Sequence, residues 1–361
     1  MLRFKGQGSH APYSAKLSEN VLSARDKGVS IFIKACGRKG YGSFMYLGVD
    51  LGGTNIAVGL VSDKGEILGQ GSTPTNSPRH YSEIVRDMAD TAKKVTEGAG
   101  YSMADVKAVG IGCPGSIDQK NGIVVYNNNL GMENVPMVQE LQKYIPVPTN
   151  IENDANAAAL GEYIVSGEGC GSFVFITLGT GVGGGIILNG KIYRGFNGAG
   201  GEIGHITLVH NGYPCTCGKK GCWESYASVT ALIRQTKEEM QANPGSLMNK
   251  LAIEKGKVSG RTAFDAAKAG DRSAQKVVDA YCEYVADGIA GTINIFQPDK
   301  LVIGGGISRE GEYLLNPIHK FMETNDYNKY LPKTQIMIAK LFNEAGIIGA
   351  AMAAKNEFEG N

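Results

Sequence analysis

The chain has 361 residues, enough for two domains of ordinary size, and its 42 % hydrophobic and 20 % charged residues are an ordinary balance for a globular protein. The formal net charge of +1 is unevenly distributed, because residues 1–44 carry eight Lys or Arg against two acids while residues 45–361 carry 28 against 33. A mildly acidic main body without a basic stripe argues against nucleic-acid binding, and no apolar run reaches the roughly 18 residues of a membrane-spanning helix.

Residues 1–44 have weak periodicity, little acid and many Gly and Ser, and they end just before a second methionine, Met45. A transit peptide would be basic, acid-poor and amphipathic, and this segment fits that description only loosely. It also lacks a helix-turn-helix pattern. We predict a dispensable N-terminal extension, or an upstream start that was read into the gene.

From Met45 an apolar strand ends at Asp50, a Gly-Gly-Thr turn leads into a second strand, and a D-K-G turn leads into a third. Gly52 and Gly53 leave backbone N–H groups with no side chain in the way, which suits phosphate oxygens, and Thr54 and Asn55 continue the turn. Asp50 is placed to meet the metal ion that accompanies a nucleotide. An ordinary hairpin would show the same short pattern.

The segment 173–193 repeats this layout, with Leu178-Gly179-Thr180-Gly181 in the place of Leu51-Gly52-Gly53-Thr54. Two such hairpins predict a duplicated β-rich lobe. The pattern G-x-G-x-x-G also occurs twice, at 110–115 and 179–184, but a dinucleotide-binding fingerprint opens a helix, whereas these segments lead into a turn and a strand. No G-x-x-x-x-G-K-[ST] loop is present, so we set the dehydrogenase and P-loop interpretations aside.

Between the repeats, residues 79–97 predict a helix, and V-K-A-V-G-I-G-C-P-G predicts a buried strand. Cys113 at its end has no His beside it in sequence, so we expect a core residue rather than a nucleophile. A short strand then precedes Asn153-Asp154, which opens a helix of small residues. Asp154 is therefore either a helix N-cap or a catalytic group, and its position alone does not decide between them.

Four zinc-competent side chains follow in the spacing H-x9-C-x-C-x4-C: His205, Cys215, Cys217 and Cys222. They make one complete tetrahedral shell, which is typical of a structural zinc site with no open position. The alternatives are a disulfide or unrelated thiols, but the other four cysteines are scattered, which favours a reducing, cytoplasmic setting. Gly218 and Gly221 would allow the tight turn, and a metal would draw Glu202 and Glu224 towards one polar pocket.

Further helices are predicted at 225–240 and 273–296. A strand then ends in Gly304-Gly305-Gly306, and the C-terminal segment is a helix rich in Gly and Ala. Such a composition allows close packing between lobes.

The motifs G-E-I-G-H, C-x-C-G-x-x-G-C-x-E and E-N-D-A-N-A-A-A-L-G-E, from about Met45 onward, resemble those of the ROK family of bacterial sugar kinases and sugar-responsive repressors. The resemblance implies an actin-like (ribonuclease H-like) α/β fold in which two lobes close over a nucleotide. We expect a small lobe at 45–150, completed by a C-terminal helix at 345–361, and a large lobe with the zinc loop at 151–344. Dimers are usual in this family, so we expect a homodimer.

The resemblance also implies roles for single residues. Asp154 is expected to be the catalytic base for the transfer of a phosphoryl group from ATP to the 6-hydroxyl of a hexose, with glucose foremost. The sugar is expected to contact Asn129, Asn153, Asp154, Glu202, His205 and Glu224. ATP and its Mg²⁺ are expected to contact Asp50, Gly52, Gly53, Thr54, Asn55, Gly179, Thr180, Gly181, Gly304, Gly305 and Gly306. The alternatives are a kinase of N-acetylmannosamine or N-acetylglucosamine, polyphosphate as the donor, and a sugar-sensing regulator without turnover.

Overall fold

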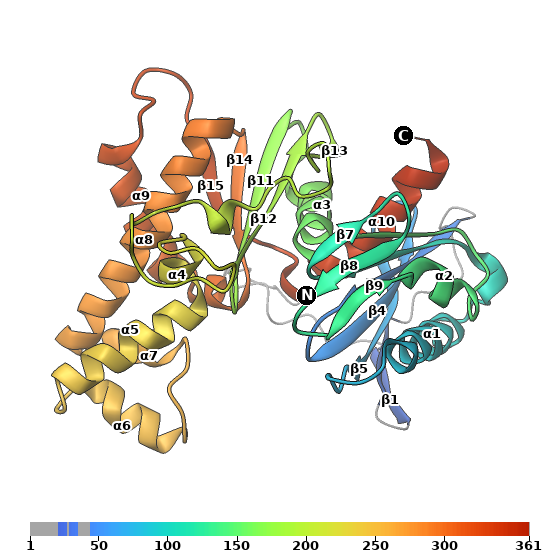
Figure 1. Ribbon diagram of the computed structural model, residues 1–361, viewed down its shortest axis with the longest axis horizontal. Helices are drawn as coiled ribbons and strands as arrows, with labels where there is room; N and C mark the ends of the chain where they lie inside the picture. Colours follow the sequence, from blue (N-terminus) through green and yellow to red (C-terminus); the bar gives the residue numbers. More distant parts are fainter. Residues whose placement is uncertain (1–20, 27–28, 35–43, 361) are drawn as a thin grey trace, which may run out of the picture.

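The computed structural model describes residues 21–26, 29–34 and 44–360, which form two lobes side by side, each built on a β-sheet (Figure 1). The small-lobe sheet has the strand order β1-β2-β5-β4-β3-β6-β10. Its strands are β1 (Val21–Asp26), β2 (Val29–Lys34), β3 (Met45–Leu51), β4 (Asn55–Ser62), β5 (Ile67–Pro74), β6 (Val106–Cys113) and β10 (Thr149–Asn153). The large-lobe sheet has the order β13-β12-β11-β14-β15. Its strands are β11 (Ser172–Leu178), β12 (Val182–Leu188), β13 (Lys191–Ile192), β14 (Lys300–Gly304) and β15 (Gln335–Ile338).

Each sheet contains the predicted hairpin. Strands β3 and β4 pair antiparallel across the first glycine turn, and β11 and β12 pair antiparallel across the second. In each lobe a later strand then joins the first hairpin strand in parallel, β6 beside β3 and β14 beside β11. The repeat seen in the sequence is therefore a repeat of topology, as the duplicated actin-like lobes require.

Helix α1 (Tyr81–Gly98) covers one face of the small-lobe sheet, and its apolar residues Ile84, Met88, Ala92 and Val95 are buried. A third, small sheet of β7 (Ser116–Asp118), β8 (Ile123–Asn127) and β9 (Met132–Val135) follows β6, and α2 (Met137–Gln142) leads from it to β10. Because β10 pairs with β6, the predicted lobe boundary at residue 150 falls inside a strand of the small-lobe sheet.

The N-terminal segment contains two strands that its weak periodicity did not predict. Strands β1 and β2 form an antiparallel hairpin, and β2 pairs with the outer edge of β5 from Ser30 opposite Ser72 to Ile33 opposite Gly69. This hairpin therefore extends the small-lobe sheet at the edge farthest from β10. The rest of the predicted extension lies outside the described residues, and whether it is dispensable stays a prediction.

The large lobe packs a helical layer on its sheet around a core that includes Trp223, Phe264 and Tyr281. The helix predicted at 225–240 is two helices, because Ser228 ends the first and caps the second by accepting from Ala231 N–H at 3.1 Å. The helices of this lobe are α4 (Glu224–Ala227), α5 (Val229–Ala242), α6 (Leu247–Glu254), α7 (Thr262–Lys268), α8 (Arg272–Phe296) and α9 (Glu312–Asn325). No helix in the described part of the chain is long and apolar enough to cross a membrane.

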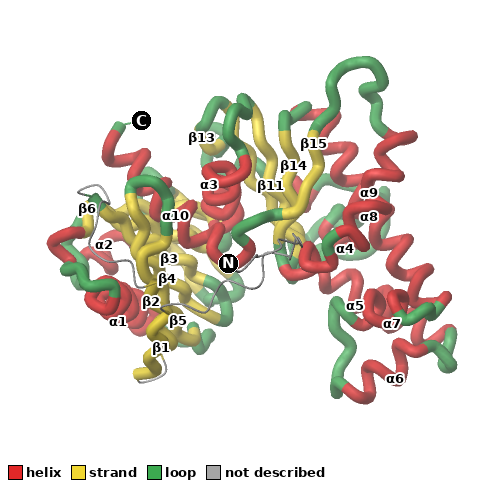
Figure 2. Tube along the Cα trace, turned by 180° about the vertical axis from the view of Figure 1, so that it is seen from behind, coloured by secondary structure: helices red, strands yellow, loops and turns green. Residues whose placement is uncertain are grey.

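Two helices, α3 (Asp154–Ser166) and α10 (Ala345–Glu359), pack together between the two sheets, as Figures 1 and 2 both show. Glycines allow the close approach. A Cβ on Gly48 of β3 would lie 1.9 Å from the carbonyl oxygen of Ile347, and one on Gly349 would lie 1.6 Å from that of Ala157. The Gly- and Ala-rich segment thus packs between the lobes, as its composition predicted.

Candidate active site

The small-lobe turn at Gly52 and Gly53 is held by contacts from its own sheet. Gly52 N–H donates to Asn55 O at 2.9 Å, the Thr75 hydroxyl donates to Gly52 O at 2.7 Å, and Thr75 N–H donates to Thr54 O at 2.8 Å. Gly53, Thr54 and Asn55 are exposed. The turn is thus held by Thr75 on one side and leaves Gly53, Thr54 and Asn55 facing solvent on the other.

The large-lobe turn is held by residues from the helical layer instead. Val229 N–H donates to Gly179 O at 2.8 Å, and the Thr230 hydroxyl donates to Thr180 O at 2.7 Å. Glu224 accepts from Val182 N–H at 3.0 Å, and a side chain on Gly181 would collide with this carboxylate. Glu224 therefore connects the turn to the cysteine loop.

The predicted nucleotide turn at Gly304–Gly306 lies beside this second hairpin. Gly305 has a φ of 84°, and a Cβ on it would lie 2.2 Å from Leu178 O, so a larger residue would push β14 and β11 apart. Two of the three predicted nucleotide-binding segments are therefore neighbours in the large lobe.

Asp154 lies where the two lobes meet, at the start of α3. A Cβ on Gly112 of β6 would touch Ala157 at 3.3 Å, and one on Gly183 of β12 would touch Ala155 at 3.2 Å, so this first helical turn lies between a strand of each lobe. The N-cap is Asn153, whose side-chain oxygen accepts from Ala155 N–H at 2.9 Å and Asn156 N–H at 3.2 Å. Asp154 is the first residue after the cap, and its Oδ1 accepts from Ala155 N–H at 2.9 Å. The interpretation of Asp154 as the helix N-cap is wrong, because Asn153 is the N-cap.

Three carboxylates influence one another at this point. Burial, together with the negative charge of Asp154, raises the pKa of Asp50 to about 7. Burial also raises the pKa of Asp154, with Glu202 adding to the shift and the Ala155 N–H opposing it. Crowded, poorly hydrated carboxylates attract a divalent cation, and a raised pKa suits a group that takes up a proton.

The predicted sugar-binding residues come from both lobes. Asn129 lies in the loop between β8 and β9, where its Cβ would be 3.9 Å from a Cβ on Gly53. Glu202 is exposed and precedes the 3-10 turn at Ile203–His205. The second oxygen of Glu224 lies 3.5 Å from Cys215 Sγ, so this residue is engaged with the cysteine loop. Asn129 thus sits on the small-lobe side and the two glutamates on the large-lobe side.

One residue that fixes the Asn129 loop was missed. Asn127 is buried, receives Leu130 N–H on its side-chain oxygen at 2.8 Å and donates from its amide nitrogen to Pro114 O. The run of three asparagines at 127–129 signals a polar loop, but nothing local distinguishes the buried member from its neighbours.

Cys113, at the end of β6, is buried as predicted, and burial raises the pKa of its thiol.

The four predicted metal ligands converge. One ligand atom from each of His205, Cys215, Cys217 and Cys222 lies within 4.8 Å of every other. His205 Nδ1 is 3.6 Å from Cys215 Sγ, and Cys217 Sγ is 3.6 Å from Cys222 Sγ, which is far longer than a disulfide bond. Gly218 and Gly221 have φ values of 89° and 80°, as the predicted turn requires. The donors fit a tetrahedral zinc ion through the Nδ1 of the imidazole.

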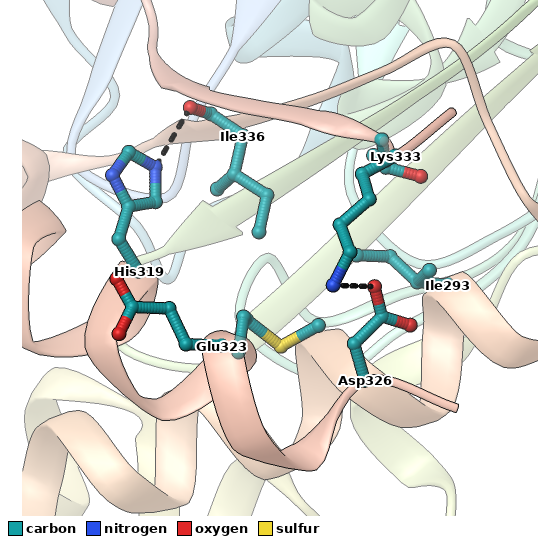
Figure 3. A pocket seen from close by; sticks show the side chains of 8 residues that line it. Ile293, His319, Glu323, Asp326, Lys333 and Ile336 are labelled. Carbon is teal, nitrogen blue, oxygen red and sulfur yellow. Dashed lines mark hydrogen bonds and ion pairs between the residues drawn. The ribbon is translucent and has the colours of Figure 1, made fainter. Parts of the chain in front are cut away.

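A cavity of about 190 Å³ lies elsewhere, between α8, α9 and β15 (Figure 3). None of the predicted site residues lines it. Its polar groups contact their neighbours, with His319 Nε2 3.2 Å from Ile336 O and Lys333 Nζ 3.2 Å from an Asp326 carboxylate oxygen. We assign no ligand to it.

Two glycine hairpins, one in each lobe, with a carboxylate between them at the lobe junction, define the class of actin-like two-lobe sugar kinases. The ROK family model matches residues 46–357, and this chain belongs to the ROK family. The family resemblance read from the motifs is confirmed.

Individual relatives resemble the chain over most of its length. It is similar to the glucokinase of Thermotoga maritima, with 39 % identity over 87 % of this chain and 98 % of that protein. The crystal structure of a ROK family glucokinase from Streptomyces griseus in complex with glucose and AMPPNP is 36 % identical, with a TM-score of 0.76 over 86 % of this chain and 99 % of that one. The xylose repressor of Caldicellulosiruptor bescii is 29 % identical over 84 % of this chain and 76 % of that protein.

Proposed function

We propose that this chain is an ATP-dependent glucokinase, which transfers the γ-phosphoryl group of ATP to the 6-hydroxyl of glucose. The observation that carries the proposal is the position of Asp154, which is partly exposed between the two glycine hairpins. Asn153, and not Asp154, is the N-cap of α3, so the Asp154 side chain is not needed for capping. The similarity to glucokinases along nearly their whole length, including one solved with glucose and an ATP analogue, supports it.

Asp154 is the proposed general base. Phosphoryl transfer needs a nucleophile in line with the leaving group, neutralisation of phosphate charge and a group that takes the hydroxyl proton. Asn153 holds the start of α3 by capping it, and this leaves the neighbouring carboxylate available for the sugar hydroxyl. The burial that raises the pKa of Asp154 also makes its carboxylate a better proton acceptor than an exposed one.

The two hairpins are proposed to bind the phosphates. Gly52 and Gly179 use their own N–H groups within the turns, donating to Asn55 O at 2.9 Å and Gly181 O at 3.0 Å. The donors proposed for phosphate oxygens are therefore the N–H groups of Gly53, Thr54 and Asn55 in one lobe and of Thr180 and Gly181 in the other. Asp50 is proposed to hold Mg²⁺, which supplies positive charge to the transferring phosphate. The turn at Gly304, Gly305 and Gly306 is proposed to receive the adenosine.

The sugar is proposed to bind Asn129, Asn153, Glu202, His205 and Glu224, whose amide, imidazole and carboxylate groups pair with hydroxyls. The zinc is proposed to be structural, held by His205 and the three cysteines and leaving the second ring nitrogen of His205 for the sugar. We also propose a cytoplasmic homodimer that binds neither nucleic acid nor membranes.

The test is a coupled assay with ATP and a panel of hexoses. We expect kcat/KM for glucose to exceed that for N-acetylmannosamine and N-acetylglucosamine by at least about tenfold, or about 1.4 kcal/mol in transition-state binding. A reversed order would move the substrate to an N-acetylated hexosamine. Binding of glucose without turnover would favour a regulator, and a parallel assay with polyphosphate would identify the donor.

A further inference from the structure

An ion pair between the half-buried Arg194 and the buried Glu152 lies next to the segment that carries Asp154. Glu152, at the end of β10, is only 4 % exposed, and Arg194 approaches one of its oxygens with Nε at 2.7 Å and a terminal nitrogen at 2.6 Å. The other oxygen accepts from Asn153 N–H at 3.0 Å and from the Asn156 side-chain amide at 3.1 Å. One carboxylate therefore holds the peptide group just before Asp154 and the first turn of α3.

Arg194 also begins the loop that leads to Glu202. Its carbonyl oxygen accepts from Gly200 N–H at 2.8 Å, which closes residues 194–200 into a compact loop. The loop is tightly packed, because a Cβ on Gly200 would lie 2.6 Å from Gly195 N. Glu202 and His205 follow within five residues, so a shift of Arg194 would move two proposed sugar contacts.

The same loop reaches the other lobe. Gly198, in its middle, has a φ of 83°, and a Cβ there would lie 3.2 Å from the carbonyl oxygen of Ile117 in β7. The segment that starts at Arg194 is thus fixed at one end to β10 and borders the small sheet beside the sugar site. Arg194 is the residue of this segment whose side chain forms an ion pair with Glu152 of β10.

We propose that Arg194 is a positioning residue for sugar binding, which acts through Glu152 and holds the loop carrying Glu202 and His205 in register with Asp154. The inference rests on the proposed hexose kinase function. Without the guanidinium, the buried Glu152 carboxylate loses its only charged partner among the described residues and leaves its position, so both the loop and the Asn153 peptide shift. The loss of Arg194 should weaken glucose binding rather than ATP binding, because Arg194 makes none of the hydrogen bonds that hold the two hairpin turns.

The test compares Arg194→Gln with Glu152→Gln and with the double variant. We expect each single variant to raise KM for glucose by at least about tenfold while KM for ATP stays within about twofold. The two residues act as one unit, so the double variant should be no worse than the more damaging single one. Arg194→Lys keeps the charge but has one side-chain nitrogen, so its KM for glucose should lie between those of wild type and Arg194→Gln. It replaces Arg194→Gln in the comparison if that variant does not fold.

Lys268→Gln is the matched control. It breaks the short ion pair with Glu310, whose side chain is as buried as that of Glu152, at 5 % exposure in both cases, and leaves Glu310 the longer contact to Arg261 at 3.8 Å. It should lower Tm and leave KM for glucose within about twofold. Equal increases of both KM values in Arg194→Gln, a glucose KM within twofold of wild type, or additive effects in the double variant would each overturn the inference.

Glucose affinity is also titrated without ATP. If wild-type protein binds glucose but does not phosphorylate it, the proposed function is contradicted. The glucose affinities of the variants then still test whether Arg194 positions the sugar-binding loop. A loss of glucose affinity in Arg194→Gln but not in Lys268→Gln supports the positioning role in either case.

Discussion

The two glycine hairpins share the layout of an apolar strand, a glycine turn and a second apolar strand, but their turns are held in different ways. The small-lobe turn is fixed by its own sheet through Thr75, whereas the large-lobe turn is fixed by Val229, Thr230 and Glu224 from the helical layer and the cysteine loop. One hairpin is thus locally determined, and the other depends on a segment that also carries proposed sugar contacts. The large-lobe turn is therefore hydrogen-bonded directly to a proposed sugar contact, Glu224, whereas the small-lobe turn only neighbours one, Asn129.

The hairpins also differ in charge. Asp50 stands just before Leu51 in the first, and the matching position before Leu178 in the second is Thr177. Of the two hairpins, the small-lobe one therefore brings a carboxylate, that of Asp50, towards Asp154. Burial and the charge of Asp154 raise the pKa of Asp50 to about 7. The side chain proposed to hold Mg²⁺ therefore comes from the small-lobe hairpin.

The largest effect is expected when the Asp154 carboxylate, between the two hairpins, is removed. Asp154→Asn keeps the shape of the side chain but cannot accept a proton, so we expect kcat to fall by about 10²- to 10⁴-fold while glucose still binds. Steady-state kinetics and glucose titration measure the two effects. A variant that keeps more than about a tenth of the wild-type kcat would exclude Asp154 as the base.

The next effect comes from the cysteine loop. Cys217→Ser should lose one zinc per chain, seen by elemental analysis, and should raise KM for glucose by at least about tenfold, because His205 and Glu224 are positioned by this loop. Full activity of metal-free protein would contradict the role of the metal as a scaffold.

A paired experiment addresses the difference between the hairpins directly. Glu224→Ala removes the acceptor of Val182 N–H and a proposed sugar contact, so we expect KM to rise about fivefold or more for both glucose and ATP. Thr75→Val removes the hydroxyl that donates to Gly52 O, so KM for ATP should rise about two- to threefold with glucose unaffected. If both variants changed only the ATP constant, the two hairpins would be equivalent.

The charge difference predicts a pH dependence of stability in protein free of nucleotide and metal. The pKa of Asp50 is about 7 when folded, against an ordinary value of 3.8, so the native state keeps a proton that the unfolded chain releases. The free energy of unfolding therefore falls as pH rises from about 4 to about 7. Asp50→Asn should match the wild-type Tm near pH 4 and exceed it at pH 8, whereas Thr177→Val should leave the pH profile unchanged.

The smallest effect is expected at the outer edge of the small lobe. Deletion of residues 1–44 removes β1 and β2 from the edge of β5, on the opposite side of the sheet order from β10. We expect kcat/KM to stay within about twofold of wild type. A large loss in a folded truncated protein would show that this hairpin supports the first glycine turn through β5.

Patterns carried by neighbouring residues could be predicted from the sequence. The two hairpins depend on glycines flanked by apolar strands, and the metal ligands fall within a span of 18 residues, so both could be predicted. The Glu152–Arg194 pair could not, because it joins residues 42 apart and Arg194 lies outside the motifs that signal the site. Strands β1 and β2 were missed for a related reason, since their pairing with β5 is a tertiary contact that weak local periodicity does not reveal.

The packing of α10 has a consequence for the order of folding during synthesis. Gly48 in β3 is covered by Ile347, and Gly161 in α3 approaches Ala345 closely enough that a Cβ would lie 2.2 Å from its carbonyl oxygen. At roughly 5 to 20 residues per second, the ribosome needs about 15 to 60 s to travel from β3 to α10. Throughout that interval one face of the first sheet has no partner from this helix. The lobes therefore reach their final packing only after α10 has left the exit tunnel, and a nascent chain stalled before it would expose this apolar face to chaperones.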